Sequence, residues 1–241
     1  MSPEKLTLGC DPELVCRVGG EFTSASDYFK YQSSMGLDGN DEIAEIRPGY
    51  STSPIDLTAK IRAVLEYGHE KYPELEFISG HYVDNYAIGG HIHISVEPTE
   101  EIIDALDVVL SSLSDCIDDQ EQIIYRRESG YGKAKAYRKK IYGLEYRTPG
   151  SFLLSPAVTL VTFTLAKLAV VGVTEDNLNF HKLKGNDDSY SFLMKIEDYL
   201  VTIPDDCREG LDELKILLAK RSINWEENIL PNWGLITEVA A

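Results

Sequence analysis

The chain has 241 residues, with 23 Lys and Arg against 40 Asp and Glu, which gives a formal net charge of −17. A chain this acidic is repelled by nucleic acids and by anionic membranes, which disfavours both as partners, whereas it attracts cations. The hydrophobic fraction of 43% and the charged fraction of 26% are ordinary for a soluble globular protein. The length allows one large domain or two small ones.

The predicted elements change character along the chain. Apolar alternation and turn residues predict strands at residues 6–8, 14–18, 21–23, 42–47, 75–83, 90–96 and 142–147. Helical spacing of apolar residues predicts helices at 55–72, 99–116, 156–172, 190–200 and 206–220. Strands thus dominate up to about residue 150 and helices after it, which is typical of an α+β fold on a mostly antiparallel sheet.

We therefore divide the chain into a sheet region at 1–155 and a helical part at 156–241, either within the same domain or as a cap. The longest apolar stretch, 152–173, is interrupted by Pro156, Lys167 and several Ser and Thr residues. This predicts a buried helix rather than a membrane span.

The cysteines and the N-terminus both indicate the cytoplasm. The four cysteines are not spaced as CxxC, so we expect reduced thiols; they are Cys10, Cys16, Cys116 and Cys207. The first residues, MSPEKLTLGCDPEL, lack the basic segment and apolar core of a signal peptide.

A basic block lies within this acidic chain. Residues 126–147 hold eight basic residues and two acidic ones, a local charge of +6 that leaves −23 for the rest. Such a block needs an anion to neutralise it, and Gly130 and Gly132 would let backbone amides approach phosphate oxygens. A solvated basic surface is the alternative interpretation.

Four segments place pairs of polar side chains two residues apart on predicted strands, so the members of each pair share a face. The pairs are Asp11 with Glu13, Glu45 with Arg47, His91 with His93, and Glu145 with Arg147. Any single pair also fits a solvent-exposed sheet face with cross-strand ion pairs. Together, carboxylates and imidazoles suit Mg²⁺ or Mn²⁺, and the arginines suit phosphate.

Known nucleotide and hydrolase motifs do not occur in the sequence. It contains no GxxxxGK[ST], no GxGxxG and no GxSxG, which disfavours P-loop, Rossmann and serine-hydrolase folds. A metal site beside a phosphate clamp is instead typical of nucleotide-dependent phosphoryl transfer.

The segments GCDPEL, GLDGNDEIAEIRPG, GGHIHIS and RRESGYGKAKAYRKKIYGLEYRTPGSF occur in this order over about residues 8–155. The ordered set resembles the phage-type COOH–NH2 ligase family, a branch of the glutamine-synthetase-like amidoligases. The resemblance implies a curved antiparallel sheet with helices packed on one face. It also implies a cytoplasmic protein, in the host cell if phage-encoded.

The resemblance implies roles for individual residues. It predicts metal ligands at Asp11, Glu13, Glu45 (with Glu42 in reserve), His91 and Glu145. It predicts contacts to ATP from His93, Arg127, Lys133, Arg138 and Arg147. Arg138 and Arg147 would also act in catalysis, and Arg47 would hold a substrate carboxylate.

The activity implied is ATP-dependent joining of a carboxylate to an amine through an acyl phosphate, with Mg²⁺ or Mn²⁺ as cofactor. Small-molecule or peptide carboxylates and amines are the expected substrates, and their identity and the oligomeric state stay open. Two alternatives remain: a phosphotransferase on the same fold, and a non-catalytic module that binds nucleotide or metal.

Overall fold

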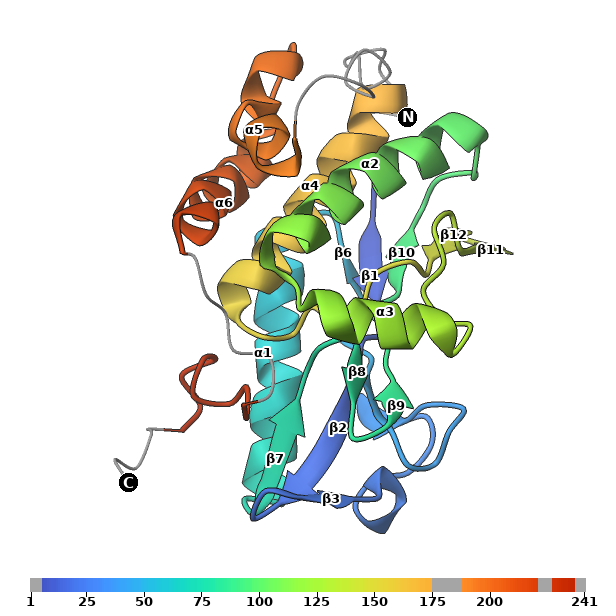
Figure 1. Ribbon diagram of the computed structural model, residues 1–241, viewed down its shortest axis with the longest axis vertical. Coiled ribbons are helices and arrows are strands. Elements are labelled where there is room, and N and C mark those ends of the chain that lie inside the picture. The colour runs from blue at the N-terminus through green and yellow to red at the C-terminus, as the bar shows by residue number, and fades with distance from the viewer. Residues whose placement is uncertain (1–5, 175–187, 221–226, 237–241) are drawn as a thin grey trace.

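The computed structural model describes residues 6–174, 188–220 and 227–236 (Figure 1). The strands in this part of the chain are short: β1 (Leu8–Cys10), β2 (Glu13–Val18), β3 (Glu21–Thr23), β4 (Met35–Leu37), β5 (Ala44–Ile46), β6 (Tyr50–Ser51), β7 (Leu75–Ile78), β8 (Tyr82–Val83), β9 (Tyr86–Ala87), β10 (Ile92–Ile94), β11 (Tyr137–Lys140) and β12 (Gly143–Tyr146). The helices are α1 (Pro54–Lys71), α2 (Glu100–Ile117), α3 (Gln120–Glu128), α4 (Pro156–Thr174), α5 (Ser189–Met194) and α6 (Arg208–Ala219), with short 3₁₀ turns η2 (Ala25–Asp27), η4 (Ile196–Tyr199) and η5 (Asp205–Cys207).

The described strands form antiparallel sheets. The first has the order β11-β12-β10-β1-β6; the second has the order β3-β2-β5-β4, with β7 also paired to β2; β8 and β9 form a hairpin. The chain crosses from the first sheet to the second through Asp11 and Pro12, which lie between β1 and β2. The predicted α+β class with antiparallel sheets and packed helices is confirmed.

One face of the first sheet is apolar. Leu8, Ile92 and Leu144 on this face are fully buried and belong to the same hydrophobic cluster as the inner residues of α2 and α4. Tyr146 on this face donates a hydrogen bond to Asp107 of α2. The helices therefore pack on one face of this sheet and leave the opposite face for polar side chains.

Helices α1 and α2 begin within one residue of the predicted positions 55 and 99, and each has a capping side chain. Helix α1 begins at Pro54. The hydroxyl group of Ser53, directly before it, accepts a hydrogen bond from the amide of Asp56. Thr99 caps α2 in the same way. Both side chains satisfy an amide that has no partner within the helix.

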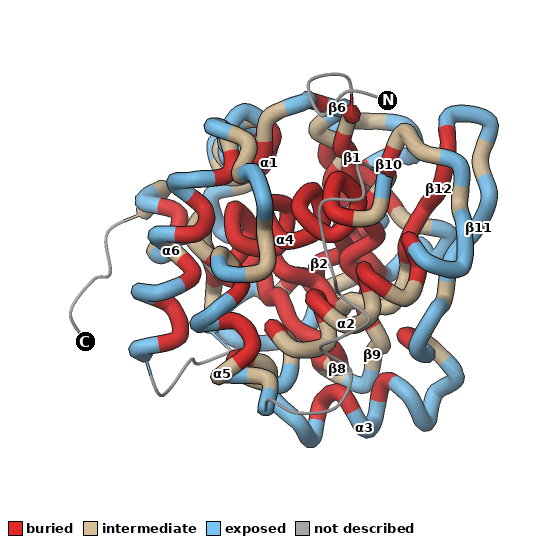
Figure 2. Tube along the Cα trace, turned by 90° about the horizontal axis from the view of Figure 1, so that it is seen from above, coloured by how far each residue is buried: buried red, intermediate tan, exposed pale blue. Residues whose placement is uncertain are grey.

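Helix α4 lies in the centre of the protein (Figure 2). It is long and apolar enough to cross a membrane by length and composition, but 83% of its apolar window is buried inside the protein. The predicted buried helix is confirmed. Lys167 is buried on α4, where its ammonium group donates to the carbonyl of Thr52 and lies 2.5 Å from the carboxylate of Asp206. The four cysteines lie in the described part and are free, as expected.

The sequence pattern missed several elements. Helix α3 and strands β4, β6, β9 and β11 were not predicted, and β11 lies within the basic block. Strands β2 and β5, which carry Glu13 and Glu45, belong to the second sheet, so the strands with paired polar residues are not all side by side in one sheet. The division at residue 155 stays a prediction.

Candidate active site

The polar face of the first sheet carries its functional groups in rows, because residues directly opposite each other in antiparallel strands share a face. Register places one row across the five strands: Tyr50, Gly9, His93, Glu145 and Arg138. The next row follows two residues farther along each strand, where the amide of Asp11 donates to the carbonyl of His91 at 3.3 Å. Two of the same-face pairs predicted from the alternation, His91 with His93 and Glu145 with Arg147, contribute one residue to each row.

The second sheet contributes a third row, at the junction of the two sheets. Glu13 pairs with Glu45 in register, and on its other side its amide donates to the carbonyl of Gly89 at 2.8 Å. A Cβ at Gly89 would lie 2.7 Å from the His91 Nε2 atom and would displace the imidazole, so a glycine here leaves the ring in place. The site thus forms where the chain passes from one sheet to the other.

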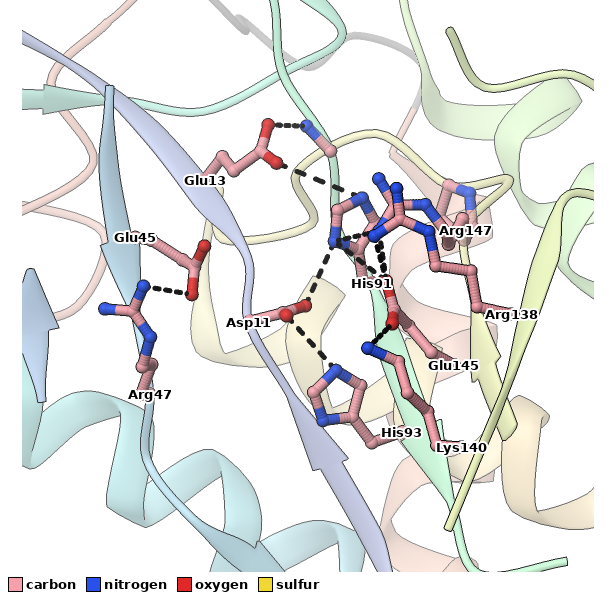
Figure 3. A network of polar contacts seen from close by, with 12 residues as sticks. Asp11, Glu13, Glu45, Arg47, His91, His93, Arg138, Lys140, Glu145 and Arg147 are labelled. Atoms are coloured by element: carbon pink, nitrogen blue, oxygen red, sulfur yellow. Dashed lines mark hydrogen bonds and ion pairs between the residues drawn. The ribbon is translucent and has the colours of Figure 1, made fainter. Parts of the chain in front are cut away.

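Three predicted metal ligands come together (Figure 3). Asp11, His91 and Glu145 offer ligand atoms that all lie within 4.8 Å of one another. The His91 Nδ1 atom lies 3.1 Å from Asp11 Oδ1 and 4.0 Å from Glu145 Oε1. His93 Nε2 lies 3.2 Å from the other oxygen of Asp11. Both imidazoles of the H-x-H motif therefore face the same carboxylate.

Three buried atoms of this cluster lack a well-aligned hydrogen bond among the described residues: Asp11 Oδ1, His93 Nε2 and Glu145 Oε2. Each has only an ion-pair contact to a neighbouring side chain. Buried polar atoms without partners are costly in a finished fold, so such atoms indicate a position for a ligand. Carboxylate oxygens and imidazole nitrogens are a donor set that suits Mg²⁺ or Mn²⁺, and the residues present fit such an ion.

Three cations surround one carboxylate of the cluster. Glu145 is buried, and its oxygens lie 2.5 Å from Lys140 Nζ and 3.8 Å from Arg138 Nη1, while Arg147 donates a hydrogen bond to it. Burial alone would raise the pKa of Glu145, but the hydrogen bonds from Lys140 and Arg147 outweigh it and lower the pKa. The carboxylate is ionised, and the three cations carry a surplus of positive charge beside the metal ligands.

The other carboxyls of the site respond differently to burial. For Asp11, burial opposes ionisation, but the hydrogen bonds and charges of His91 and His93 hold its pKa well below the usual range. Desolvation, and then the charge of Asp38, raise the pKa of Glu13 to about 8. Desolvation, and then the charge of Asp11, raise the pKa of Glu45 to about 9. A bound cation would favour the ionised form of both glutamates.

A cavity of about 550 Å³ lies beside the cluster. Its lining includes Asp11, Glu45 and His93 of the predicted site, together with the exposed rings of Tyr50 and Tyr142. The ring of Tyr142 lies 5.5 Å from that of His93, centroid to centroid. Between Tyr50 and His93 the sheet carries only Gly9, so the floor of the cavity has no side chain there.

Arg47 is already engaged. Its guanidinium lies 2.7 Å from Glu45 and donates to the carbonyls of Leu37 and Ser33. It ties β5 to the preceding segment, and its predicted contact with a substrate carboxylate stays a prediction. The reserve ligand Glu42 is exposed and accepts a hydrogen bond from Tyr86, so Glu45 is the better placed of the two.

Two predicted ATP contacts lie outside the cluster. Arg127 is exposed on α3, where it lines a separate small pocket with His81 and Asp118. Lys133 is exposed in the segment between α3 and β11. Within the described residues, neither side chain makes a hydrogen bond or an ion pair with the metal ligands, and their roles stay predictions.

Sequence reasoning missed Tyr131, Lys140 and Arg126. Tyr131 contacts Glu13, His91 and Arg147. Lys140 shares a face with Arg138 because the two are separated by one residue on β11; interpreting the basic block as a strand would have found it. Nothing in the sequence distinguishes the buried Arg126 from its exposed neighbour.

The site thus places a carboxylate and imidazole cluster that fits a divalent ion beside three cationic side chains, on antiparallel sheets. Residues 8–216 match the family described as Phage phiEco32-like COOH.NH2 ligase-type 2, and the chain belongs to this family. No curated protein matches the chain significantly.

Two solved structures are similar in fold. One, described as a novel glutamine synthase homolog, is 13% identical; the match covers 96% of this chain and 71% of that one, with a TM-score of 0.48. The other is a bifunctional glutathione synthetase from Pasteurella multocida, which is 10% identical. The match covers 97% of this chain and 51% of that one, with a TM-score of 0.52. This chain spans about half the length of the second, and at such identities the likeness concerns the fold alone.

Proposed function

We propose that the protein is an ATP-dependent carboxylate–amine ligase that forms an amide bond through an acyl phosphate. The observation that carries the proposal is the cluster of Asp11, His91 and Glu145, edged by three cations on the Glu145 side. Membership of the COOH.NH2 ligase family supports it. The expected substrates are small-molecule or peptide carboxylates and amines, in the cytoplasm.

Asp11, His91 and Glu145 would hold the divalent ion, Mg²⁺ or Mn²⁺. When bound, the ion supplies the positive charge that lets two anions, a carboxylate and a triphosphate, approach each other. Glu145 is held in strand β12 by its pairing with His93, and Asp11 and His91 directly adjoin the ends of β1 and β10, where a backbone hydrogen bond joins them. These short tethers to the sheet limit the freedom of the ligands.

Arg138, Lys140 and Arg147 would bind the γ-phosphate. They project from neighbouring strands β11 and β12 toward Glu145, so they reach the phosphate side of the site together (Figure 3). Arginine donates in a planar fork that matches phosphate oxygens, and lysine adds a point charge. Charge that develops on the transferred phosphoryl group is thereby stabilised.

The cavity beside His93 would hold the nucleoside. Its two tyrosine rings offer stacking surfaces, and it opens from the same carboxylate, Asp11, that contributes to the metal cluster. This arrangement leads the phosphates from the cavity toward the three cations.

The reaction then has two steps. A carboxylate oxygen of the substrate attacks the γ-phosphorus, the bond to the bridging oxygen breaks, and ADP leaves. The amine attacks the carbonyl carbon of the acyl phosphate, loses a proton, and phosphate leaves with the carboxylate oxygen. Arg147 and Arg138 stay in contact with phosphate oxygens through both steps.

The test is a screen of carboxylate and amine pairs for ADP release with Mg²⁺ or Mn²⁺, read by mass spectrometry for an adduct that has lost one water. The variant Glu145→Gln should abolish ADP release. Its matched control is Glu97→Gln, because Glu97 is an exposed carboxylate that pairs with Lys139 of the same β11 strand.

Once an active pair is found, a carboxylate labelled with ¹⁸O should transfer one label to phosphate. ADP release without an amine, together with a stable phosphorylated product, would favour the phosphotransferase. Failure of every pair to stimulate ADP release would contradict the ligase and favour a binding module.

A further inference from the structure

The segment after α3 places Tyr131 in contact with His91 and Glu13 of the candidate site. Gly130 and Gly132 both have positive φ, 89° and 67°, and they turn the chain on either side of Tyr131. The Cζ atom of Arg126 lies 4.6 Å from the centroid of the Tyr131 ring, and the Cζ atom of Arg147 lies 5.7 Å from the same centroid. The ring therefore contacts two cations, which help to fix its position.

The hydroxyl group of Tyr131 meets three groups of the site. It donates to Glu13 Oε1 at 3.0 Å, lies 2.5 Å from His91 Nε2, and accepts from Arg147 Nη2 at 3.4 Å. The other oxygen of Glu13 accepts from the amide of Gly89 at 2.7 Å. Both oxygens of Glu13 thus have hydrogen-bond donors already.

The two nitrogens of His91 face different partners. Nδ1 faces the carboxylates of Asp11 and Glu145, whereas Nε2 faces Tyr131. A neutral imidazole that offers its Nδ1 lone pair to a metal carries its proton on Nε2. That proton then needs an acceptor, and the tyrosine oxygen is the acceptor in place, since its own proton goes to Glu13.

We infer that Tyr131 is a positioning residue for the metal site: it accepts the Nε2 proton of His91, passes a hydrogen bond on to Glu13, and so aims His91 Nδ1 at the ion. Glu13 then acts on the ion through Tyr131 and His91 rather than by direct contact alone. The inference rests on the metal site of the proposed function, and it assigns a role to a residue of the basic block that carries no charge.

The absence of a side chain at Gly89 makes room for the contact between Tyr131 and His91. A Cβ at this position would lie 2.7 Å from both the Tyr131 hydroxyl and His91 Nε2. Both distances are shorter than a carbon can approach these atoms without displacing them. The backbone therefore leaves open the space in which the tyrosine and the histidine meet.

The experiment compares Tyr131→Phe with Tyr125→Phe as a matched control. Tyr125 lies on α3, is exposed, and also donates its hydroxyl to a glutamate, Glu121, at 2.7 Å. We expect the Mn²⁺ affinity, measured by calorimetry without nucleotide, to fall about 10- to 100-fold in Tyr131→Phe. It should stay at the wild-type value in Tyr125→Phe, and thermal melts check that both variants fold.

A spectroscopic measurement tests the inference on the unaltered protein. In ¹⁵N spectra of the Mg²⁺-loaded chain, with the signals of His91 identified by their loss in His91→Asn, Nε2 should carry a slowly exchanging, hydrogen-bonded proton. This protection should disappear in Tyr131→Phe. Activity plays no part in either readout.

The outcomes separate the two proposals. Wild-type Mn²⁺ affinity in Tyr131→Phe, or coordination of Mg²⁺ by Nε2 in place of Nδ1, would overturn the role of Tyr131 and leave the ligase proposal standing. A wild-type chain that binds neither ion would overturn the metal site of the proposed function and this inference with it.

Discussion

Replacing Arg126 with Met should destabilise the protein far more than the same change at its neighbour Arg127. Arg126 is 2% exposed, and its guanidinium donates to the carbonyls of Thr148 and Pro149 at 2.7 and 2.8 Å. Burial lowers its pKa to about 10, so it is still charged at neutral pH. Arg127 is exposed on the same helix.

The magnitude follows from the contacts that are lost. Removing the guanidinium leaves the carbonyl of Thr148 without a donor, at about 1–3 kcal/mol. The carbonyl of Pro149 loses one hydrogen bond, at about 1 kcal/mol, but still accepts from the amide of Gly90. The contact with the Tyr131 ring adds about 1–2 kcal/mol. Relief of the buried charge and the packing of the Met stem offset part of this loss. We expect the free energy of unfolding to fall by about 2–4 kcal/mol in Arg126→Met, against about 0.5 kcal/mol or less in Arg127→Met.

Urea unfolding followed by circular dichroism, in the presence of a chelator, measures both variants. A loss below about 1 kcal/mol in Arg126→Met would refute the reasoning from buried carbonyls. The same pair of variants tests the predicted ATP contact of Arg127. If that contact exists, Arg127→Met raises the KM for ATP without changing stability.

Three further predictions concern the cavity, the core and the junction. Tyr142→Ala should raise the KM for ATP at least tenfold, because a stacked base contributes about 1–3 kcal/mol. The control Tyr137→Ala, on the other face of the hairpin, should leave the KM unchanged. Equal KM values for the two variants would contradict the assignment of the cavity to the nucleoside. Lys167→Met should lower the free energy of unfolding by about 1–3 kcal/mol, because the carbonyl of Thr52 and the half-buried carboxylate of Asp206 both lose the buried ammonium group. The exposed Lys215→Met should change it by less than about 1 kcal/mol, and similar urea midpoints for the two variants would contradict this. Gly89→Ala should weaken Mn²⁺ binding at least about tenfold in calorimetry, since its methyl group displaces a ligand imidazole, and unchanged affinity would show that the site tolerates the shift.

The sequence was sufficient to predict which polar side chains share a face of a strand, because this depends only on the two-residue period of the strand. Alternation predicted that His91 and His93 share a face, and both contact Asp11. The same rule paired Glu145 with Arg147, which are hydrogen-bonded. These inferences needed no tertiary information, because side chains two residues apart on a strand point the same way whichever sheet the strand joins.

The parts that failed depend on contacts between distant segments. Strand β5 pairs with β2 of the second sheet because the chain turns at Asp11 and Pro12, and no local pattern fixes where a strand leaves one sheet for another. Helix α3 was missed because few of its residues are apolar, and one of the residues it buries is Arg126. A buried arginine is recognised only by the distant carbonyls that satisfy it.

The uncharged members of the site were missed for a similar reason. Charge and glycine content drew attention to the basic block as a phosphate ligand, but not to Tyr131 within it. Its importance comes from the position of its hydroxyl group. The turns at Gly130 and Gly132 and the contacts of the ring with two arginines set that position.

Helix α4 has a consequence for how the protein is made. The strands that carry the metal ligands end at Tyr146, yet α4, which helps to cover their apolar face, begins only at Pro156. While the chain emerges from the ribosome, the part of the apolar sheet face that α4 covers stays exposed to water until the whole helix has been synthesised. We therefore expect a product truncated at residue 155 to aggregate rather than fold, and the ligand rows to assemble only after synthesis has passed the end of the helix.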